Sequence, residues 1–341
     1  MKFYEITIRP LSAFGTSLKG DTLFGHFCWQ AAYDPSLLEG GLEKALAQYP
    51  EKPFAVFGTA CPKFKGKSSR YVFKRPDVPL SWLFPAKNKE NCEQRYKDMK
   101  ENKKRKWMLL GEDLQIDLVN SHLITNEDLA GEALGLVAPE TRKLMEDAGD
   151  RSLFRSFLQP HNTINRLSGT TGTGAFAPYS TVNDYYCPET ELAIFVWVDE
   201  TLTRIESIRK GLEAIGRFGF GRDASTGLGR FEIVDAKEFE WPRVTHANAA
   251  YTLAPCVPET YNQAYFTPFI RYGKHGDRLA TSQNPFKNPV IMADEGAVFV
   301  PVDAEFFDKP YMGRAVTGVS KAQTNAVTQG YAPYLPLRLE Y

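Results

Sequence analysis

Apolar and polar residues alternate with period two at the start of the chain, and strand-forming residues dominate again near its middle. The alternation predicts a strand over Lys2–Arg9. Glu191–Val198 is so rich in β-branched and aromatic residues that it is the strongest strand prediction in the sequence. A further strand is expected over Arg230–Ala236, and a hairpin is expected from Pro53–Cys61 and Tyr71–Lys74.

A spacing of three and four between apolar residues marks the helices. It predicts a helix over Arg204–Ile215. An earlier helix is expected to be capped by Asp21 or Thr22 and to end near Tyr33, before a proline. Two shorter helices are expected at Gly41–Tyr49 and Glu140–Ala148.

The order of these elements is the βαββαβ plan of a ferredoxin-like domain. We therefore predict an α+β fold with antiparallel sheets and an N-terminal domain over residues 1–242, interrupted by an insertion at about 60–150. The polar, cationic segment Asn88–Leu110 permits a helix and resembles inserted sequence more than a core element. A sheet of this plan leaves one face open, as in RNA-recognition folds, so that face is a candidate binding surface.

After Trp241-Pro242 the pattern changes to short strands with little helical periodicity. We predict a second, β-rich domain over residues 243–341, a degenerate ferredoxin-like copy of the first. The expected strands are Tyr251–Cys256, Tyr265–Tyr272, Val290–Asp294, Ala297–Val302 and Tyr334–Glu340.

Composition narrows the function classes. The 341 residues are 43% hydrophobic, but no apolar run approaches the roughly 20 residues that a membrane helix needs. The five cysteines match neither a zinc motif nor a disulfide framework, which favours the reduced cytoplasm and predicts no metal and no cofactor. A net charge of zero argues against a free-standing nucleic-acid binder. Lys63–Arg75 nevertheless holds six cations and no carboxylate, which suits a solvated face or a subunit that binds RNA within an assembly.

Glycine and arginine gather in Ile215–Ile233. Five glycines and three arginines lie there, and the only carboxylate before Arg230 is Asp223. Glycine lets the backbone approach a ligand, and successive N–H groups form anion-binding concavities. A dinucleotide-binding motif would need strand, turn, helix, whereas the order here is helix, loop, strand. The loop is therefore a candidate site for phosphate or RNA backbone, with a plain glycine connector as the alternative.

A carboxylate-free segment runs from Arg151 to Asn183. Its arginines, amides, hydroxyls and His161 can donate hydrogen bonds to phosphates, sugars and base edges. Phe176 and Tyr179 offer rings on which bases could stack. Glycines within this segment predict a pliable hairpin that reaches out of the domain, with an ordinary surface hairpin as the alternative.

The loop that enters the first helix holds Lys19, Thr22 and further hydroxyls beside the free N–H groups of the helix start, where anions are favoured. The P-loop sequence is absent. His26 follows Thr22 by four residues, so both lie on one helical face. A lone helical histidine is more often structural than catalytic.

Together, these segments resemble RAMP-superfamily proteins of CRISPR systems and, more narrowly, the fourth subunit of type III-A Csm effector complexes, which caps the crRNA 5′ end. The helix at Asp21–Trp29 makes the match to that subunit specific, and no family motif occurs over Phe64–Leu153. The similar stretches are Ser12–Trp29, Asn162–Gly169, Gly219–Phe231 and Lys287–Phe299.

The resemblance implies tandem ferredoxin-like domains that hold the repeat-derived 5′ tag of the crRNA between the glycine loop and the first helix. A protruding thumb hairpin, here about Leu167–Asn183, would separate tag from guide, close to target RNA at that junction. The partners would be the large polymerase-like subunit and a backbone RAMP subunit. The subunit itself would have no catalytic residue.

The expected RNA contacts combine glycine N–H groups and arginines on phosphates with side-chain donors at the thumb root and along the first helix. The residues are Lys19, Thr22, His26, His161, Asn162, Asn165, Arg166, Arg217, Gly219, Gly221, Arg222, Ser225, Gly227, Gly229 and Arg230.

Two alternatives stay open. In the first, the chain is a crRNA-processing endoribonuclease in which His26 is the general acid or base and Lys19 stabilises the phosphorane, which requires close approach to the 2′-hydroxyl or the leaving oxygen. In the second, the chain is a scaffold that contacts only proteins through its basic runs.

Overall fold

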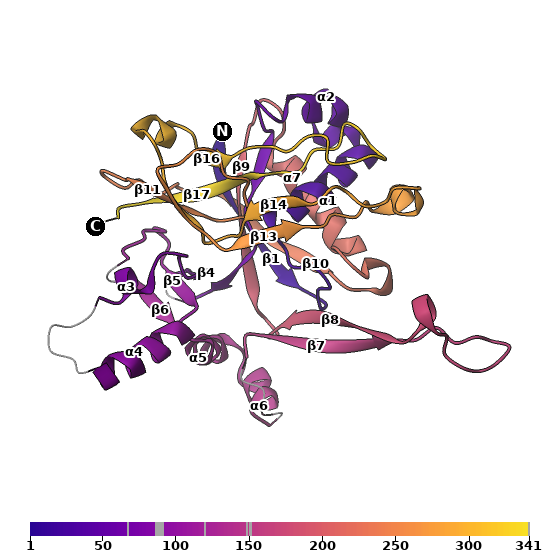
Figure 1. Ribbon diagram of the computed structural model, residues 1–341, viewed down its shortest axis with the longest axis horizontal. Coiled ribbons are helices and arrows are strands. Elements are labelled where there is room, and N and C mark those ends of the chain that lie inside the picture. The colour runs from indigo at the N-terminus through magenta and orange to yellow at the C-terminus, as the bar shows by residue number, and fades with distance from the viewer. Residues whose placement is uncertain (67, 86–91, 119–120, 148, 150–151, 340–341) are drawn as a thin grey trace.

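A computed structural model describes residues 1–66, 68–85, 92–118, 121–147, 149 and 152–339 (Figure 1). The predicted ends at Asn88, Ala148 and Glu340, and Arg151 of the carboxylate-free segment, lie outside the described residues.

An antiparallel sheet of eight strands forms the centre of the molecule, with its main path in the order β10-β1-β9-β3-β4-β5-β6. The alternating and β-branched segments form the neighbouring strands β1 and β9, and β10 lies at the edge beside β1. The strands predicted over Lys2–Arg9, Glu191–Val198 and Arg230–Ala236 are therefore confirmed. The strands are β1 (Lys2–Pro10), β2 (Ala55–Phe57, paired with β9), β3 (Cys61–Phe64), β4 (Arg70–Lys74), β5 (Trp107–Leu110), β6 (His122–Ile124), β9 (Glu191–Val198) and β10 (Phe231–Glu238).

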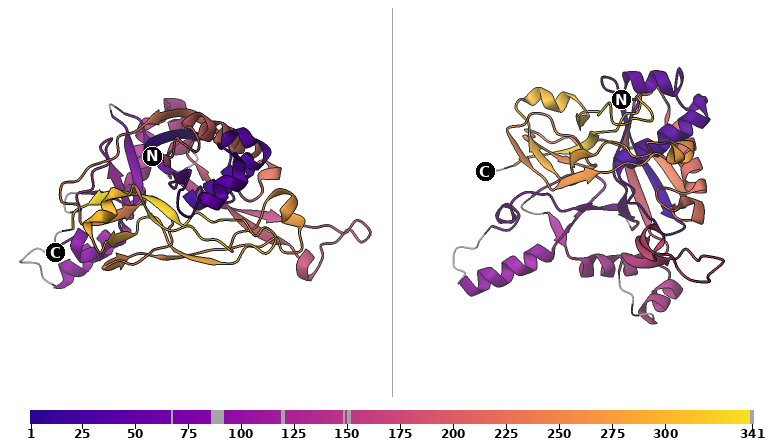
Figure 2. Two further views of the ribbon diagram at one scale, coloured as in Figure 1. Left: turned by 90° about the horizontal axis from the view of Figure 1, so that it is seen from above. Right: turned by 45° about the vertical axis from the view of Figure 1, so that its right-hand side comes forward.

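Helices α1 (Gly20–Tyr33) and α7 (Ile205–Phe218) pack against each other beside this sheet, and α2 (Gly41–Gln48) lies next to α1 (Figures 1 and 2). Gly211 permits the close approach of the two long helices, because a Cβ there would lie 2.6 Å from the ring of Phe27. The apolar spacing in α7 buries Ile208 and Leu212 completely. Both long helices are confirmed.

The other face of the sheet is covered, so the predicted open face is wrong. Phe3, Phe195 and Trp197 of β1 and β9 are buried. The chain that follows β10 folds back over them and places Phe239 5.3 Å from the ring of Phe195 and Trp241 5.6 Å from that of Trp197. Aromatic residues that could have stacked on bases are instead core residues.

The C-terminal half forms a five-stranded antiparallel sheet, in the order β12-β15-β11-β17-β16, and a separate ribbon, β13–β14. Its only described helices are short 3₁₀ turns, as the lack of helical periodicity indicates. Tyr251, Leu335 and Leu337 join the apolar core of the first sheet. The strands are β11 (Ala249–Thr252), β12 (Gln263–Tyr265), β13 (Pro268–Arg271), β14 (Val290–Ala293), β15 (Val298–Val300), β16 (Tyr311–Gly313) and β17 (Tyr331–Leu337), and the 3₁₀ turns are η4 (Asp277–Thr281) and η5 (Ala304–Asp308).

The segment predicted as an insertion contributes four strands, β3 to β6, to the main sheet. The strand expected over Pro53–Cys61 is interrupted. The strands β2 and β3 both pair with β9, and the chain between them departs from β9. Asn88–Leu110 ends in strand β5, whose Met108 is fully buried, so part of this segment is core. The accompanying helices are α3 (Leu80–Leu83), α4 (Cys92–Lys104), α5 (Asn126–Leu136) and α6 (Pro139–Asp147), and the remaining 3₁₀ turns are η1 (Pro35–Leu37), η2 (Gly174–Phe176) and η3 (Ala224–Thr226).

A long hairpin extends from the body of the molecule, with its tip farthest out (Figures 1 and 2). Strands β7 (Phe154–His161) and β8 (Tyr179–Tyr186) are paired along their whole length. The hairpin predicted at Leu167–Asn183 therefore begins earlier in the chain, and the predicted range covers only its tip and most of one strand. The carboxylate-free composition identified the segment but not the pairing that starts at Phe154.

Candidate RNA-binding site

The three segments identified in the sequence meet at one place. The N–H of Arg222 in the glycine loop donates to Thr16 Oγ1 at 3.0 Å, which joins that loop to the segment before α1. Phe14 in that same segment exchanges two backbone hydrogen bonds with Asp184 at the hairpin base, of 2.7 and 2.9 Å. Arg222 closes the triangle, because its guanidinium donates to Asn183 Oδ1 at 3.0 Å and to the carbonyl of Val182. Residues that are 206 positions apart in sequence are thereby held in one surface.

The glycine N–H groups point inward, so their predicted role as phosphate donors is wrong. Gly219 donates to Ile215 O at 2.8 Å, Gly227 to Ala224 O at 3.0 Å and Gly229 to Ala13 O at 2.7 Å, while Gly221 donates to His26 Nε2 at 3.1 Å. All four glycines have positive φ. At Gly229 a Cβ would also lie 2.1 Å from Phe220 O. The glycines are therefore needed for the backbone conformation and close packing of the loop.

The cationic side chains of this loop face outward. Arg217, Ser225 and Arg230 are exposed. Within the described residues, neither Arg217 nor Arg230 makes a side-chain ion pair. Arg222 is partly committed, since its guanidinium also lies 3.3 Å from Asp223 Oδ2. The two free arginines are the groups in this loop that can reach a phosphate.

His26 supports the glycine loop from the middle of α1. Its Nε2 accepts the Gly221 N–H, and its ring packs 4.5 Å from the buried ring of Phe220. Burial lowers the pKa of His26 to about 4, so the imidazole is neutral at physiological pH. The acceptor role requires an unprotonated Nε2, which agrees with this direction.

Lys19 and its neighbours hold the two halves of the chain together. The Lys19 ammonium lies 2.5 Å from both Asp294 Oδ1 and Glu295 Oε2, so this predicted RNA-binding residue is already engaged by two carboxylates. Lys19 occupies the cap position of α1 without a side-chain cap bond. The predicted caps are also wrong: Asp21 instead pairs bidentately with Arg271 at 2.5 and 2.9 Å.

Thr22, the other predicted cap, lies on the first turn of α1. Its hydroxyl oxygen is buried and has no hydrogen-bond partner among the described residues.

The two carboxyl groups opposite Lys19 have pKa values shifted in opposite directions. Burial and the neighbouring Asp294 raise the pKa of Glu295 to about 7, despite the attraction of Lys19. The pKa of Asp294 is lowered by its hydrogen bond with Glu295 and by Lys19, against its own burial. Asp294 therefore carries the charge that balances the lysine.

The hairpin tip presents three of its four predicted residues with a free donor. Asn162 and Arg166 are exposed, and neither side chain has a partner among the described residues. Asn165 Oδ1 accepts the N–H of Leu167 at 2.9 Å, whereas its Nδ2 makes no hydrogen bond within the described residues. His161 Nε2 lies 3.0 Å from Thr181 Oγ1, and its ring stacks on Tyr179 at 5.0 Å.

Sequence reasoning missed one exposed aromatic beside the loop. Phe218, the last residue of α7, is 68% exposed between Arg217 and the first loop glycine. The helical spacing marked Ile215 as the end of the buried stripe, and a ring beyond that stripe is the signal that could have identified it.

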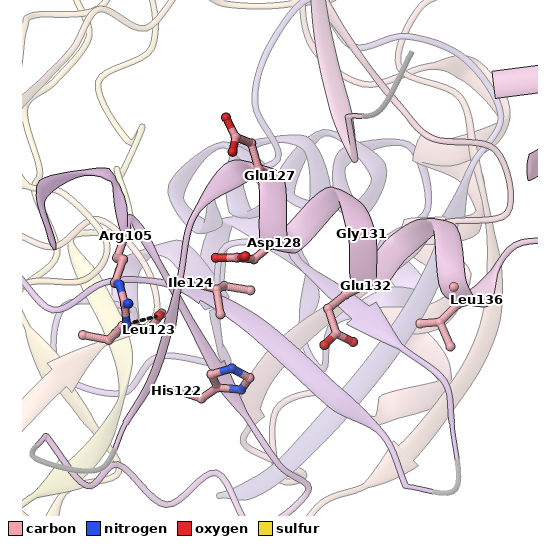
Figure 3. Close-up of a pocket in the computed structure, with 10 residues that line it drawn as sticks. Arg105, His122, Leu123, Ile124, Glu127, Asp128, Gly131, Glu132 and Leu136 are labelled. Carbon is pink, nitrogen blue, oxygen red and sulfur yellow. Dashed lines mark hydrogen bonds between the residues drawn. The ribbon is translucent and has the colours of Figure 1, made fainter. Parts of the chain in front are cut away.

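An open pocket of about 790 Å³ lies between β6 and α5, outside this convergence (Figure 3). Three of its charged side chains are occupied by structural contacts. Asp128 belongs to the capping box of α5, and Glu132 pairs with Arg70 at 2.6 Å. Arg105 donates to the carbonyl of Leu123. These contacts explain the pocket as part of the scaffold.

In the described part of the chain, no three His, Cys, Asp or Glu side chains come together as a metal site. No described helix has both the length and the apolar character to cross a bilayer.

No family model and no curated protein matches the chain in sequence. Solved structures match it over essentially its whole length. A chain in the crystal structure of the Csm3–Csm4 subcomplex of the type III-A CRISPR-Cas interference complex is 12% identical, with a TM-score of 0.55 and coverage of 99% of this chain and 100% of that chain.

Two chains from crystal structures of the Csm1–Csm4 cassette are also similar. The one with pppApA is 16% identical with a TM-score of 0.53 and covers 100% of this chain and 99% of that chain. The one with cA4 is 14% identical with a TM-score of 0.54 and full coverage of both. Csm4 is the component that the two kinds of assembly share, and the chain has the fold found in them.

Proposed function

We propose that this chain is a non-catalytic, Csm4-like subunit of a type III-A CRISPR effector complex, acting in the cytoplasm in antiviral defence, and that it binds the 5′ repeat-derived tag of the crRNA. The observation that carries the proposal is the convergence of three acid-poor segments around outward-facing arginines. The shared fold over the full length supports it.

In this proposal Arg217 and Arg230 contact phosphates of the tag, and Ser225 and Arg222 lie along the same path. Thr22, His26 and the loop glycines lie behind this surface and support its backbone conformation. Asn162 and Arg166 at the hairpin tip contact RNA at the junction of tag and guide, close to the target strand, with His161 and Asn165 fixing the shape of the tip. The hairpin is then the thumb.

The finer architecture is part of the proposal. The order β10-β1-β9-β3 with two packed helices supports a ferredoxin-like domain over residues 1–242. The second sheet supports a degenerate copy over residues 243–341. The proposed protein partners are the large polymerase-like subunit and a backbone RAMP subunit, as the names of the similar assemblies suggest.

The nuclease alternative has little support from the geometry. His26 Nε2 is used by the Gly221 N–H, and Lys19 is held by two carboxylates. Neither group is available to a reacting phosphate. Metal-independent cutting of repeat RNA by the purified protein, lost in His26→Ala, would reverse this conclusion.

The salt dependence of crRNA binding tests the proposal. Each lost phosphate contact should flatten the slope of log Kobs against log salt by about 0.7 for single-stranded RNA. We expect this for Arg217→Ala and for Arg230→Ala. Arg314→Ala removes the same charge from an exposed position in the C-terminal half and should leave the slope unchanged. Equal slopes in all three variants would contradict the assigned site.

A further inference from the structure

A second pocket, of about 330 Å³, lies where the main sheet, the hairpin base and the C-terminal half meet. Its walls are mostly apolar and aromatic. Trp107 of β5 and Phe154 of β7 meet edge to face at 5.4 Å, and Phe154 lies 6.4 Å from Tyr186 of β8. Tyr251 of β11 forms part of the facing wall. A concave, largely apolar site of this size with a few polar groups is typical of a pocket for a small molecule or for one chemical group of a larger ligand.

The pocket adjoins the candidate RNA-binding surface through two shared segments. Thr16 holds the glycine loop, and the next residues, Ser17 to Lys19, line the pocket. Asn183 accepts from Arg222, and the next residue, Asp184, lines the pocket from the other face of β8. The segment before α1 and strand β8 therefore each connect the arginine surface to the pocket.

The charged groups in the pocket wall already have partners. Lys19 lies 2.5 Å from both Asp294 and Glu295, and Lys74 lies 3.3 Å from Asp77. Asp184 accepts from Ser156 at 2.5 Å. No lining lysine is left over to neutralise a phosphate, so the pocket suits an uncharged ligand with a flat apolar face.

A hydroxyl and a carboxyl of the pocket wall can face the edge of such a ligand. The hydroxyl oxygen of Thr59 is buried and has no partner among the described residues. Glu295 also lines the pocket, where its Oε2 is held by Lys19 at 2.5 Å. With its pKa raised to about 7, this carboxyl can donate as well as accept at neutral pH.

We propose that this pocket binds a single nucleobase that the RNA turns out of its stack. The ring lies among Trp107, Phe154 and Tyr186, and its polar edge faces Thr59 and Glu295. The inference rests on the proposed function, since the RNA strand must lie on the arginine surface.

Single abasic sites placed one at a time along the crRNA tag test the proposal with the full-length protein. At one position the abasic RNA should bind roughly tenfold more weakly, within the range for a stacked base. Ser17→Trp places a large ring at the exposed rim of the pocket. In this variant intact RNA should bind as weakly as the abasic RNA, and the abasic site should have no further effect.

Ser36→Trp is the matched control, because it adds the same ring at an exposed serine beside α2 and should leave both affinities unchanged. A second readout is 2-aminopurine at the sensitive position, whose fluorescence should be quenched by the wild-type protein and not by Ser17→Trp. Trp107→Phe keeps a ring in the pocket and should retain binding while losing the RNA-induced change in tryptophan emission.

The outcomes separate the two proposals. If no variant and no wild-type protein binds the tag, the proposed function fails. If the tag binds and Ser17→Trp weakens every RNA equally, or no abasic position matters, the base pocket is wrong and the function stands. Quenching of Trp107 by the polymerase-like subunit without RNA would assign the pocket to a protein side chain and overturn the proposal.

Discussion

At the scale of single residues, the amides of glycines 219, 221, 227 and 229 are each bonded within the protein, although the composition of the loop favours free amides. What the sequence could not supply is the location of His26 Nε2 or Ala13 O. The positive φ of the glycines is a local property that composition does show, whereas their acceptors come from distant segments.

His26 gives a residue-scale prediction. His26→Ala leaves the Gly221 N–H without its acceptor, which should lower the free energy of unfolding by roughly 1–3 kcal/mol. Urea denaturation at pH 7.5 measures this change. His26→Gln, which can still accept, should recover part of it. Equal stability of the alanine variant and the wild type would show that the bond is not structural.

The same histidine should make stability depend on pH. In the unfolded chain its pKa is near 6.5, and in the folded protein it is about 4. Between these values the unfolded state binds more protons, so this contribution to stability is complete above 6.5 and is lost as pH falls toward 4. The difference in unfolding free energy between wild type and His26→Ala should therefore shrink from pH 7.5 to pH 5.

At the scale of elements, the hairpin is separable from the body. Its strands pair with each other, and its tip residues 162–170 are all exposed. Replacing residues 162–178 by Asn-Gly joins His161 to Tyr179, which already face each other, through a favoured two-residue turn. We expect the unfolding free energy to change by less than about 0.5 kcal/mol, as for other exposed sites.

In contrast, the shortened hairpin should bind crRNA that spans the tag–guide junction more weakly while binding the isolated tag normally. Filter binding with the two RNAs measures this difference. A large loss of stability on shortening would show that the tip packs on the body.

Strong local patterns predicted the elements well. Glu191–Val198 became a fully buried central strand because β-branched and aromatic residues suit a sheet covered on both faces. Strand β7 was missed because Phe154–His161 lacks alternation and has mostly exposed side chains, so only its pairing with β8 makes it a strand. The closed sheet face was also beyond the sequence, since residues 239–241 cover it by tertiary packing.

At the scale of the whole molecule, Lys19 and the pair Asp294–Glu295 join segments 275 residues apart in sequence. Folded Glu295 keeps its proton up to about pH 7, whereas the unfolded chain releases it near 4.5. Between these values the folded state binds more protons, so stability decreases as pH rises, by at most about 1.4 kcal/mol per pH unit.

Glu295→Gln cannot ionise and should remove this slope. Its unfolding free energy should be close to that of the wild type at pH 5 and higher at pH 8, as measured by urea denaturation. A variant less stable at pH 8 would show that the charged Glu295 pairs favourably with Lys19. His26→Ala serves as the comparison, because its pH effect has the opposite sign.

The core shared by β1, β9 and β17 also orders events during synthesis. Leu335 and Leu337 are fully buried in the same apolar cluster as Ile6 and Ile194. Until β17 has left the ribosome, the apolar side chains of β1 and β9 that pack against it stay exposed. The N-terminal part of the nascent chain therefore cannot complete its core. A ribosome stalled before residue 331 should therefore hold a chain that proteases cut readily and chaperones retain, and the proposed RNA surface would be completed only after translation passes that point.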